Sequence, residues 1–167
     1  MEHRISVFSV ISSLMTVKEP HKLAADRMLM RLARWLRLLG ADVITDASLS
    51  GAELLRVARS GGRVLITRDK RLRTAPDVIF VESNAFRDQL REVVIRLGID
   101  ARAIAFTRCS QCNHLLVPVA RELVGRRVPP YVFASHDRFS ECEGCGRIYW
   151  PETHPARIRA LLDSIGV

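Results

Sequence analysis

The chain has 167 residues, of which 48% are hydrophobic, and it carries a formal net charge of +8 at pH 7. This length suits one medium domain with a small appendage, and this apolar content excludes an intrinsically disordered chain. No apolar run approaches the roughly 20 residues that a membrane-spanning helix needs, so we expect no membrane association.

The excess of basic residues lies mainly in residues 1–105. A basic surface around an acidic pocket suits a polyanionic substrate with metal ions as mediators. The alternative is a generally Arg-rich composition without functional meaning.

An apolar stretch over residues 5–15 follows the charged N-terminus. It has the length of the apolar region of a signal peptide. Cleavage after the small residues near Ala25 would, however, cut into the first predicted strand. We therefore interpret residues 1–21 as an N-terminal extension and expect the protein in the cytoplasm.

Residues 22–26 form the first predicted strand, which ends at Asp26. A helical pattern follows over residues 27–39, and Gly40 is a natural stop. The leucines share one broad face of this helix, and Arg27, Arg31 and Arg34 share the opposite face. These arginines are either phosphate ligands or a solvated helix face, and Asp26 is either a site residue or a helix N-cap.

Strand and helix then alternate up to Gly98. Strands are predicted over residues 41–45, 63–67 and 77–81, and helices over residues 52–59 and 86–97. Asp46 follows the second strand, and Arg68 and Asp69 follow the third. This alternation predicts an α/β fold with a parallel sheet flanked by helices.

Four cysteines in two CxxC pairs give the most specific signal in the second half of the chain: Cys109, Cys112, Cys142 and Cys145. Four thiolates suffice for one closed tetrahedral zinc site, which would be structural. Asn113 and Gly146 follow the pairs and tolerate the left-handed backbone that such turns need. Residues 113–141 separate the pairs, which exceeds the usual interval of about 15–20 residues and implies an inserted loop.

The rest of this half has weaker signals. We predict a strand over residues 115–119, a hairpin arm over residues 147–150 and a terminal helix over residues 155–165. Pro129-Pro130 is predicted to break regular structure. Tyr149 and Trp150 either stack on a nucleic acid or pack within the zinc module.

Three acids, Asp26, Asp46 and Asp69, each follow a predicted strand. A parallel sheet would gather them at its carboxyl edge, where open α/β folds bind ligands. Clustered carboxylates repel unless a counter-charge is present, and Mg²⁺ or Mn²⁺ prefers such oxygen ligands. The alternative is that these acids only cap helices and turns.

Several segments, in order along residues 22–155, together resemble the Mut-seven C-terminal RNase family: AADRMLMRLARWLRLLGADVITD, GGRVLITRDKRL, FTRCSQCN, RVPPYVFASHDRF and ECEGCGRIYW. The resemblance implies a PIN-like ribonuclease domain followed by a zinc ribbon. By position, Asp26 matches the first acid of the family and Asp69 its late acid. Asp46 falls in the middle acidic region, where this chain keeps only Glu53 nearby, so the third ligand is either Asp46 or Glu53.

A fourth acidic ligand would come from Glu82 or Asp88. The expected boundaries are residues 22–105 for the PIN-like domain and residues 106–167 for the zinc ribbon with its C-terminal helix.

The predicted function is metal-dependent cleavage of RNA, with Asp26, Asp46 and Asp69 as catalytic residues that bind Mg²⁺ or Mn²⁺. The phosphates of the RNA partner would be bound by a set of arginines: Arg27, Arg31, Arg34 and Arg68. The main alternative is a non-catalytic RNA- or ribosome-binding protein with the same fold and zinc. A toxin-type PIN nuclease is disfavoured by the zinc appendage.

Overall fold

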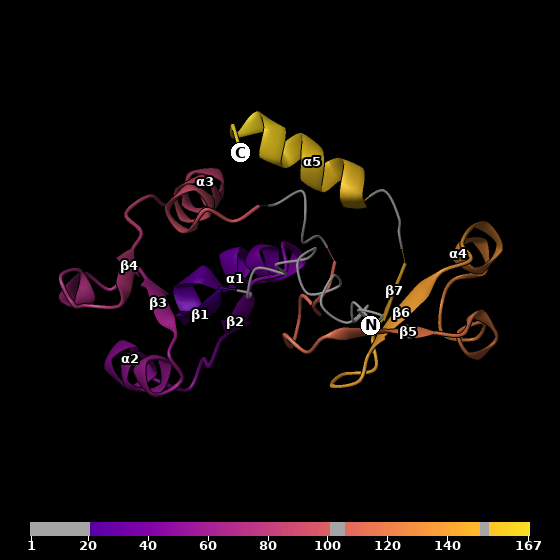
Figure 1. Ribbon diagram of the computed structural model, residues 1–167, viewed down its shortest axis with the longest axis horizontal. Helices are drawn as coiled ribbons and strands as arrows, with labels where there is room; N and C mark the ends of the chain where they lie inside the picture. The colour runs from indigo at the N-terminus through magenta and orange to yellow at the C-terminus, as the bar shows by residue number, and fades with distance from the viewer. Residues whose placement is uncertain (1–20, 101–105, 151–153) are drawn as a thin grey trace, which may run out of the picture.

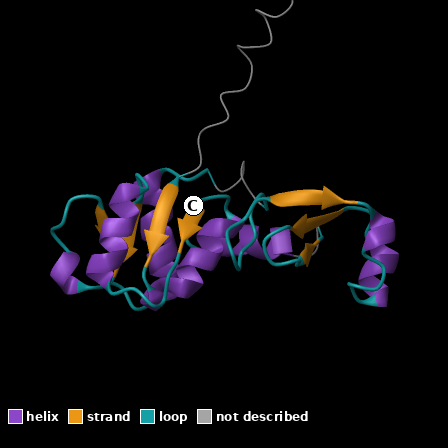
Figure 2. Ribbon diagram, turned by 90° about the horizontal axis from the view of Figure 1, so that it is seen from below, coloured by secondary structure: helices purple, strands orange, loops and turns teal. Residues whose placement is uncertain are grey.

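The computed structural model describes residues 21–100, 106–150 and 154–167. The chain forms a mixed α/β part and a smaller antiparallel part, which lie side by side (Figure 1, Figure 2). The extension expected over residues 1–21 lies outside the described residues, apart from His21.

A parallel sheet with strand order β2-β1-β3-β4 is the centre of the first part. Its strands are β1 (Lys22–Ala25), β2 (Asp42–Ile44), β3 (Val64–Thr67) and β4 (Val78–Phe80). All three strand pairs are parallel. The central strands β1 and β3 are the most buried, as expected where helices cover both faces. This sheet confirms the predicted α/β fold.

Helices cover both faces of the sheet. Leu23 and Ala25 of β1 point into a core shared with α1 (Met30–Leu38), α3 (Phe86–Leu97) and α5 (His154–Ser164). Ala24, between them, points into a second core with α2 (Gly51–Ser60). This is the alternation that a strand imposes.

Short 3-10 turns follow two of the strands: η3 (Arg27–Leu29) after β1 and η4 (Lys70–Leu72) after β3. The helix predicted from residue 27 therefore begins as a tighter turn. The N–H of Met28 donates to Asp26 Oδ1 (2.8 Å) and fixes this start.

The strand order reverses direction between β1 and β3. The chain leaves β1 through α1 toward the edge strand β2, and then returns through α2 on the other face to β3. From β3 it continues to β4 on the far side. The carboxyl ends of β1 and β3 therefore flank the switch point of the sheet, where open α/β folds bind their ligands.

The second part contains an antiparallel sheet with order β5-β6-β7. Its elements are β5 (Leu116–Val119), η5 (Arg121–Leu123), α4 (Pro130–Ser135), β6 (Phe139–Cys142) and β7 (Ile148–Tyr149). Residues between the two cysteine pairs thus form more than a loop. They enclose a core of their own, made of Val124, Val128, Val132 and Phe139.

The prediction that Pro129-Pro130 breaks regular structure is wrong in one respect. Pro129 is the N-cap of α4, and Pro130 is its first residue. The first helical position tolerates proline because its N–H has no partner within the helix, and the fixed φ of proline suits the helix start.

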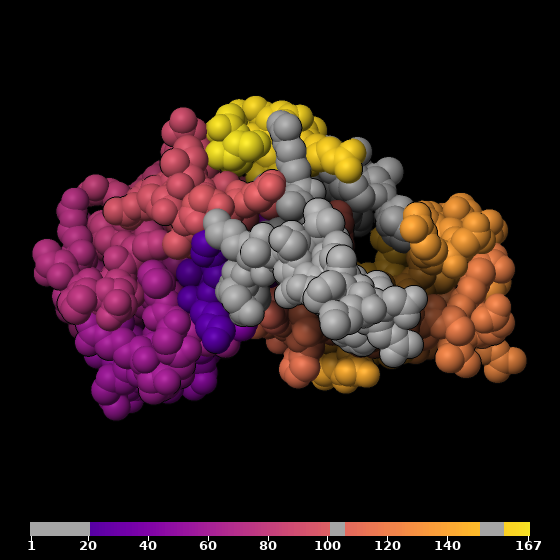
Figure 3. Space-filling view, viewed as in Figure 1, coloured from indigo at the N-terminus to yellow at the C-terminus, as the bar shows by residue number. Residues whose placement is uncertain are grey.

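Helix α5 returns from the second part to the first. Leu162 and Ile165 are buried in the core beneath α1 and α3, and Arg91 Nε donates to the carbonyl of Ile165 (2.9 Å). Figure 3 shows α5, in yellow, against the segment that contains α3. None of the described helices is long and apolar enough to cross a membrane.

Polar contacts join the two parts at the edge strand β2. Arg37 is only 2% exposed, yet its guanidinium donates to four oxygens. Two of these acceptors are the carbonyls of Ser110 (3.2 Å) and Gln111 (2.8 Å), and the others are the Val43 carbonyl and Thr45 Oγ1. Asn113 accepts from the N–H of Val43 (3.0 Å) and donates to Asp42 (2.7 Å).

Candidate active site and zinc site

Asp26 lies at the carboxyl end of β1 with only 7% of its surface exposed. Its Oδ1 accepts from Met28 N, and its Oδ2 accepts from the hydroxyl of Thr67 and the N–H of Arg68 (3.2 Å). Asp26 is therefore an N-cap, as the alternative interpretation held, and it also binds the end of the neighbouring strand β3. A cap alone does not need this second set of donors.

Thr67 connects the two strand-end acids. Its hydroxyl donates to Asp26 and accepts from the N–H of Asp69 (3.0 Å), and the residue is fully buried. Thr67 was not among the predicted site residues. The signal that identifies it is a polar residue at the last position of a strand that is otherwise apolar.

Asp69 follows β3 and faces the start of α2. Both of its oxygens accept from the guanidinium of Arg71, with 2.9 Å between Asp69 Oδ1 and Arg71 Nε and 2.6 Å between Asp69 Oδ2 and Arg71 Nη2. These hydrogen bonds and the positive charge of Arg71 hold the pKa of Asp69 below its ordinary value. A Cβ placed on Gly51 would lie 3.1 Å from Asp69 Oδ2, so the absence of a side chain at Gly51 leaves room for this carboxylate.

The other candidate acids are held by their own neighbours. Asp46 follows β2 and accepts from the N–H (2.9 Å) and hydroxyl of Ser48, which lower its pKa. Glu53 forms a capping box with Ser50 at the start of α2, and this lowers the pKa of Glu53. Glu82 is paired with Arg73, and Asp88 accepts from Ser83.

The predicted acids thus follow β2, β1 and β3, three adjacent strands of the sheet. Within the described ranges, however, the cysteine cluster is the only group of three or more His, Cys, Asp or Glu residues close enough to hold a metal ion. Asp26 and Asp69 are linked through Thr67, whereas Asp46 turns back onto Ser48.

The predicted RNA-binding arginines lie in the segments that follow β1 and β3. Arg27 is in η3, Arg31 and Arg34 are in α1, and Arg68 follows β3. The Arg31 guanidinium lies over the ring of Phe86, 4.1 Å from its centroid. Arg68 has a buried Nε without a hydrogen-bond partner in the described structure.

The four cysteines bring their sulfur atoms within 4.8 Å of one another. The Sγ atoms of Cys109 and Cys145 are 3.7 Å apart, and those of Cys112 and Cys142 are 3.3 Å apart. A tetrahedron of sulfurs around zinc, with Zn–S bonds of about 2.3 Å, has edges of about 3.8 Å. All four thiols are free, so the donor set and its spacing fit a closed zinc site.

The two CxxC turns have the same backbone form. Asn113 N donates to the carbonyl of Cys109 (3.0 Å), and Gly146 N donates to that of Cys142 (2.7 Å). Asn113 and Gly146 have φ angles of 73° and 69°, which confirms the left-handed turns predicted there. The matching geometry means that both turns present their sulfurs in the same way.

Tyr149 and Trp150 both have structural roles. The Tyr149 hydroxyl lies 3.0 Å from Cys109 Sγ, and Trp150 packs against the core around Val124 and Phe139. Burial opposes ionisation of Cys109, but Tyr149 and the backbone N–H groups of its CxxC turn outweigh it and hold the pKa of Cys109 at about 6. Burial raises the pKa of Cys142 to about 12.

Comparison with known proteins identifies the family of the chain. A family model described as "Mut7-C RNAse domain" matches residues 21–162, which include the sheet, the acids and all four cysteines. No curated protein and no solved structure matches the chain. Because the family model spans both parts of the molecule, the chain belongs to the Mut7-C RNAse domain family.

Proposed function

We propose that this protein is a metal-dependent ribonuclease whose active site lies at the carboxyl ends of β1 and β3. The observation that carries the proposal is the link between Asp26 and Asp69 through Thr67. It holds two acids, distant in sequence, at the switch point of the parallel sheet. Membership of the Mut7-C RNAse domain family supports nuclease chemistry for the chain.

Asp26 and Asp69 are the proposed ligands of Mg²⁺ or Mn²⁺, and Asp46 is the third, with Glu53 as its alternative. Such an ion supplies activation of water and charge stabilisation during phosphodiester cleavage. Asp69 is engaged by Arg71, whose side chain is 85% exposed. Arg71 can leave the carboxylate without giving up a buried position, so Asp69 would be open to a divalent cation once Arg71 moves aside.

Asp26 needs no such exchange. Its two oxygens accept three hydrogen bonds, whereas a carboxylate has about four lone-pair sites. The fixed carboxylate of Asp26 thus retains capacity for a ligand. Thr67 is the proposed positioning residue, because it holds both Asp26 and the backbone of Asp69.

Single-stranded RNA is the proposed substrate. The arginines of the segments that follow β1 and β3, namely Arg27, Arg31, Arg34 and Arg68, form no ion pair within the described part of the chain. Unpaired guanidinium groups attract phosphates irrespective of sequence, and such binding weakens with salt. The cysteine cluster is the proposed site of a structural zinc ion. Reduced thiolates suit the cytoplasm, which is the proposed location.

The test is cleavage of a fluorescently labelled single-stranded RNA by the full chain with added Mg²⁺ or Mn²⁺. Asp26→Asn and Asp69→Asn should each lower the cleavage rate by roughly 100-fold or more. Asn also serves as an N-cap, so the start of η3 should persist in the first variant. Circular dichroism verifies the fold.

Asp77→Asn is the matched control, because Asp77 precedes β4 at the opposite edge of the sheet and pairs with Arg59. It should cleave like the wild type. If the wild type shows no metal-dependent cleavage, or if both aspartate variants retain it, the nuclease proposal is wrong.

A non-catalytic RNA-binding protein is the second candidate. It is favoured by the local partners that hold Asp46 and Asp69. In the same experiment it predicts that the wild type binds RNA and that added metal produces no cleavage.

A further inference from the structure

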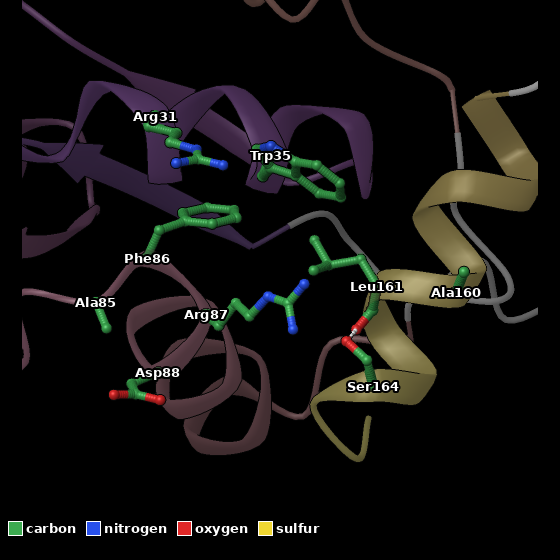
Figure 4. A pocket seen from close by; sticks show the side chains of 9 residues that line it. All are labelled: Arg31, Trp35, Ala85, Phe86, Arg87, Asp88, Ala160, Leu161 and Ser164. Carbon is green, nitrogen blue, oxygen red and sulfur yellow. Dashed lines mark hydrogen bonds between the residues drawn. The ribbon is translucent and has the colours of Figure 1, made fainter.

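A cavity of about 730 Å³ lies between α1, the first turn of α3 and the last turns of α5 (Figure 4). This volume is within the range of small-ligand sites. The cavity is on the α1 and α3 face of the sheet. Because both helices begin just after a strand, it lies near the carboxyl edge that carries Asp26.

Two aromatic rings form one wall of this cavity. The centroids of Trp35 and Phe86 are 5.5 Å apart, and the rings are tilted by 52°. Arg31 covers one face of Phe86 at 4.1 Å. In Figure 4 the Trp35 ring lies beside the space between α1 and α5, with Leu161 across from it. Trp35 is thus available as a stacking surface next to a cation.

The charge of this wall is positive. Arg87 is exposed and extends from α3 toward Leu161, and it forms no hydrogen bond or ion pair with any described residue. Asp88 also lines the cavity, and its carboxylate accepts a hydrogen bond from the hydroxyl of Ser83 (2.9 Å). Two guanidinium groups, those of Arg31 and Arg87, thus line the cavity against the single carboxylate of Asp88, and this positive balance favours an anionic ligand.

We propose that this cavity binds one unpaired nucleotide of the RNA, with its base stacked on Trp35 and its phosphate held by Arg31 and Arg87. The combination of an aromatic platform and cations is what single-stranded nucleic acids require. Arg31 lies five residues after Asp26, a rise of roughly 8 Å. The nucleotide would thus be close to the proposed scissile bond, and the proposal rests on the proposed function in this respect.

The experiment measures the affinity of the full chain for a fluorescein-labelled single-stranded RNA by anisotropy, without added Mg²⁺ or Mn²⁺. Trp35→Leu keeps an apolar side chain in the core and removes the stacking surface. It should weaken binding by about 5- to 150-fold, the range expected for one stacked base. An RNA with one abasic position should lose less affinity for this variant than for the wild type.

Arg87→Gln tests the charge without touching the core. It should weaken binding and lower the slope of log affinity against log salt by about 0.7, the value for one phosphate contact on a single strand. Arg56→Gln is the matched control, because Arg56 is an exposed residue of α2 on the opposite face of the sheet. It should keep the affinity of the wild type.

The binding assay does not depend on cleavage, so the two proposals fail separately. Equal affinity of Trp35→Leu, Arg87→Gln and Arg56→Gln for RNA would overturn the nucleotide site and leave the nuclease proposal intact. A loss of affinity confined to the first two variants would support the site even if the wild type never cleaves RNA.

Discussion

The carboxylate of Asp42 accepts hydrogen bonds from side chains of both parts of the molecule. Arg63 donates to both of its oxygens (2.8 and 3.1 Å), and Asn113 donates to Oδ1 (2.7 Å). Burial opposes ionisation of this carboxyl, but these donors prevail and hold its pKa below the ordinary value of 3.8. A folded-state pKa below the unfolded-state value stabilises the fold above the latter, and this contribution is lost as the pH falls through the folded pKa.

Comparison of the wild type with Asp42→Asn tests this sign. The difference in free energy of unfolding should be constant above about pH 5 and should shrink as the pH falls toward about 3. Urea unfolding across this range measures it, and protonation of the cysteines cancels because both proteins carry them. Asp77→Asn, whose side chain is 60% exposed in the wild type, should show no such trend. A difference that grows on acidification would contradict the assignment.

Gly51 lies next to the carboxylate of Asp69, so a side chain at this position should affect the proposed metal site. An alanine Cβ there would lie 3.1 Å from Asp69 Oδ2 and 3.2 Å from Leu72 Cδ1, which is tighter than ordinary contact. Gly51→Ala should change the free energy of unfolding by no more than about 1 kcal/mol. It should raise the Mn²⁺ concentration needed for half-maximal RNA cleavage, because Asp69 must shift. Gly61→Ala, at the other end of α2, should not, and equal metal requirements would rule out the effect.

At the scale of elements, the helices and strands of the first part could largely be predicted from their sequence. The predicted helix over residues 86–97 matches α3, and α2 begins at a capping box of Ser50 and Glu53. Local signals decide such boundaries. Helix α4 is not predicted because a pair of prolines indicates a break in regular structure, whereas here Pro129 caps the helix and Pro130 begins it. The burial of α4 also depends on a core that includes Phe139, which follows the helix.

For the candidate active site, the positions of the acids along the chain could be predicted, but their hydrogen-bond partners could not. That Asp26, Asp46 and Asp69 follow strands could be predicted from the apolar runs before them. Their partners could not, because the bond from Thr67 to Asp26 joins two strands and the bond from Asp69 to Arg71 depends on the η4 turn. Which side chains meet across a sheet depends on the order of its strands, and this order cannot be determined from a single sequence.

The two CxxC turns lead to a quantitative prediction of the zinc content. We expect one zinc ion per chain, measured by mass spectrometry of the purified protein. Cys112→Ser should abolish stoichiometric zinc and unfold the second part, because metal binding supplies much of the folding energy of such modules. Gln111→Ala is the control, since the described hydrogen bonds of Gln111 use its backbone carbonyl and N–H and not its side chain. Zinc retained by Cys112→Ser would contradict a four-cysteine site.

At the scale of the whole molecule, the first CxxC turn connects the zinc module to the sheet. The turn presents the carbonyls of Ser110 and Gln111 to Arg37, and Asn113 at its end reaches β2. The second CxxC turn has Gly146 in the same position and no side chain there. Among the described residues, therefore, one of the two equivalent turns carries this contact, and the two parts should unfold together as long as the contact persists.

Asn113→Gly tests this coupling, because glycine keeps the left-handed backbone at φ 73° but removes the bonds to Val43 and Asp42. The chain has two tryptophans, Trp35 in the sheet part and Trp150 in the zinc module. Trp35→Phe and Trp150→Phe therefore give single reporters for each part. With Asn113 present, the urea transitions reported by the two tryptophans should coincide. Asn113→Gly should separate the two transitions and lower the free energy of unfolding of the sheet part by about 1–3 kcal/mol. The zinc content of this variant should be unchanged. Coincident, unshifted transitions in that variant would mean that the remaining contacts, among them those of Arg37, Arg108 and α5, suffice to couple the two parts.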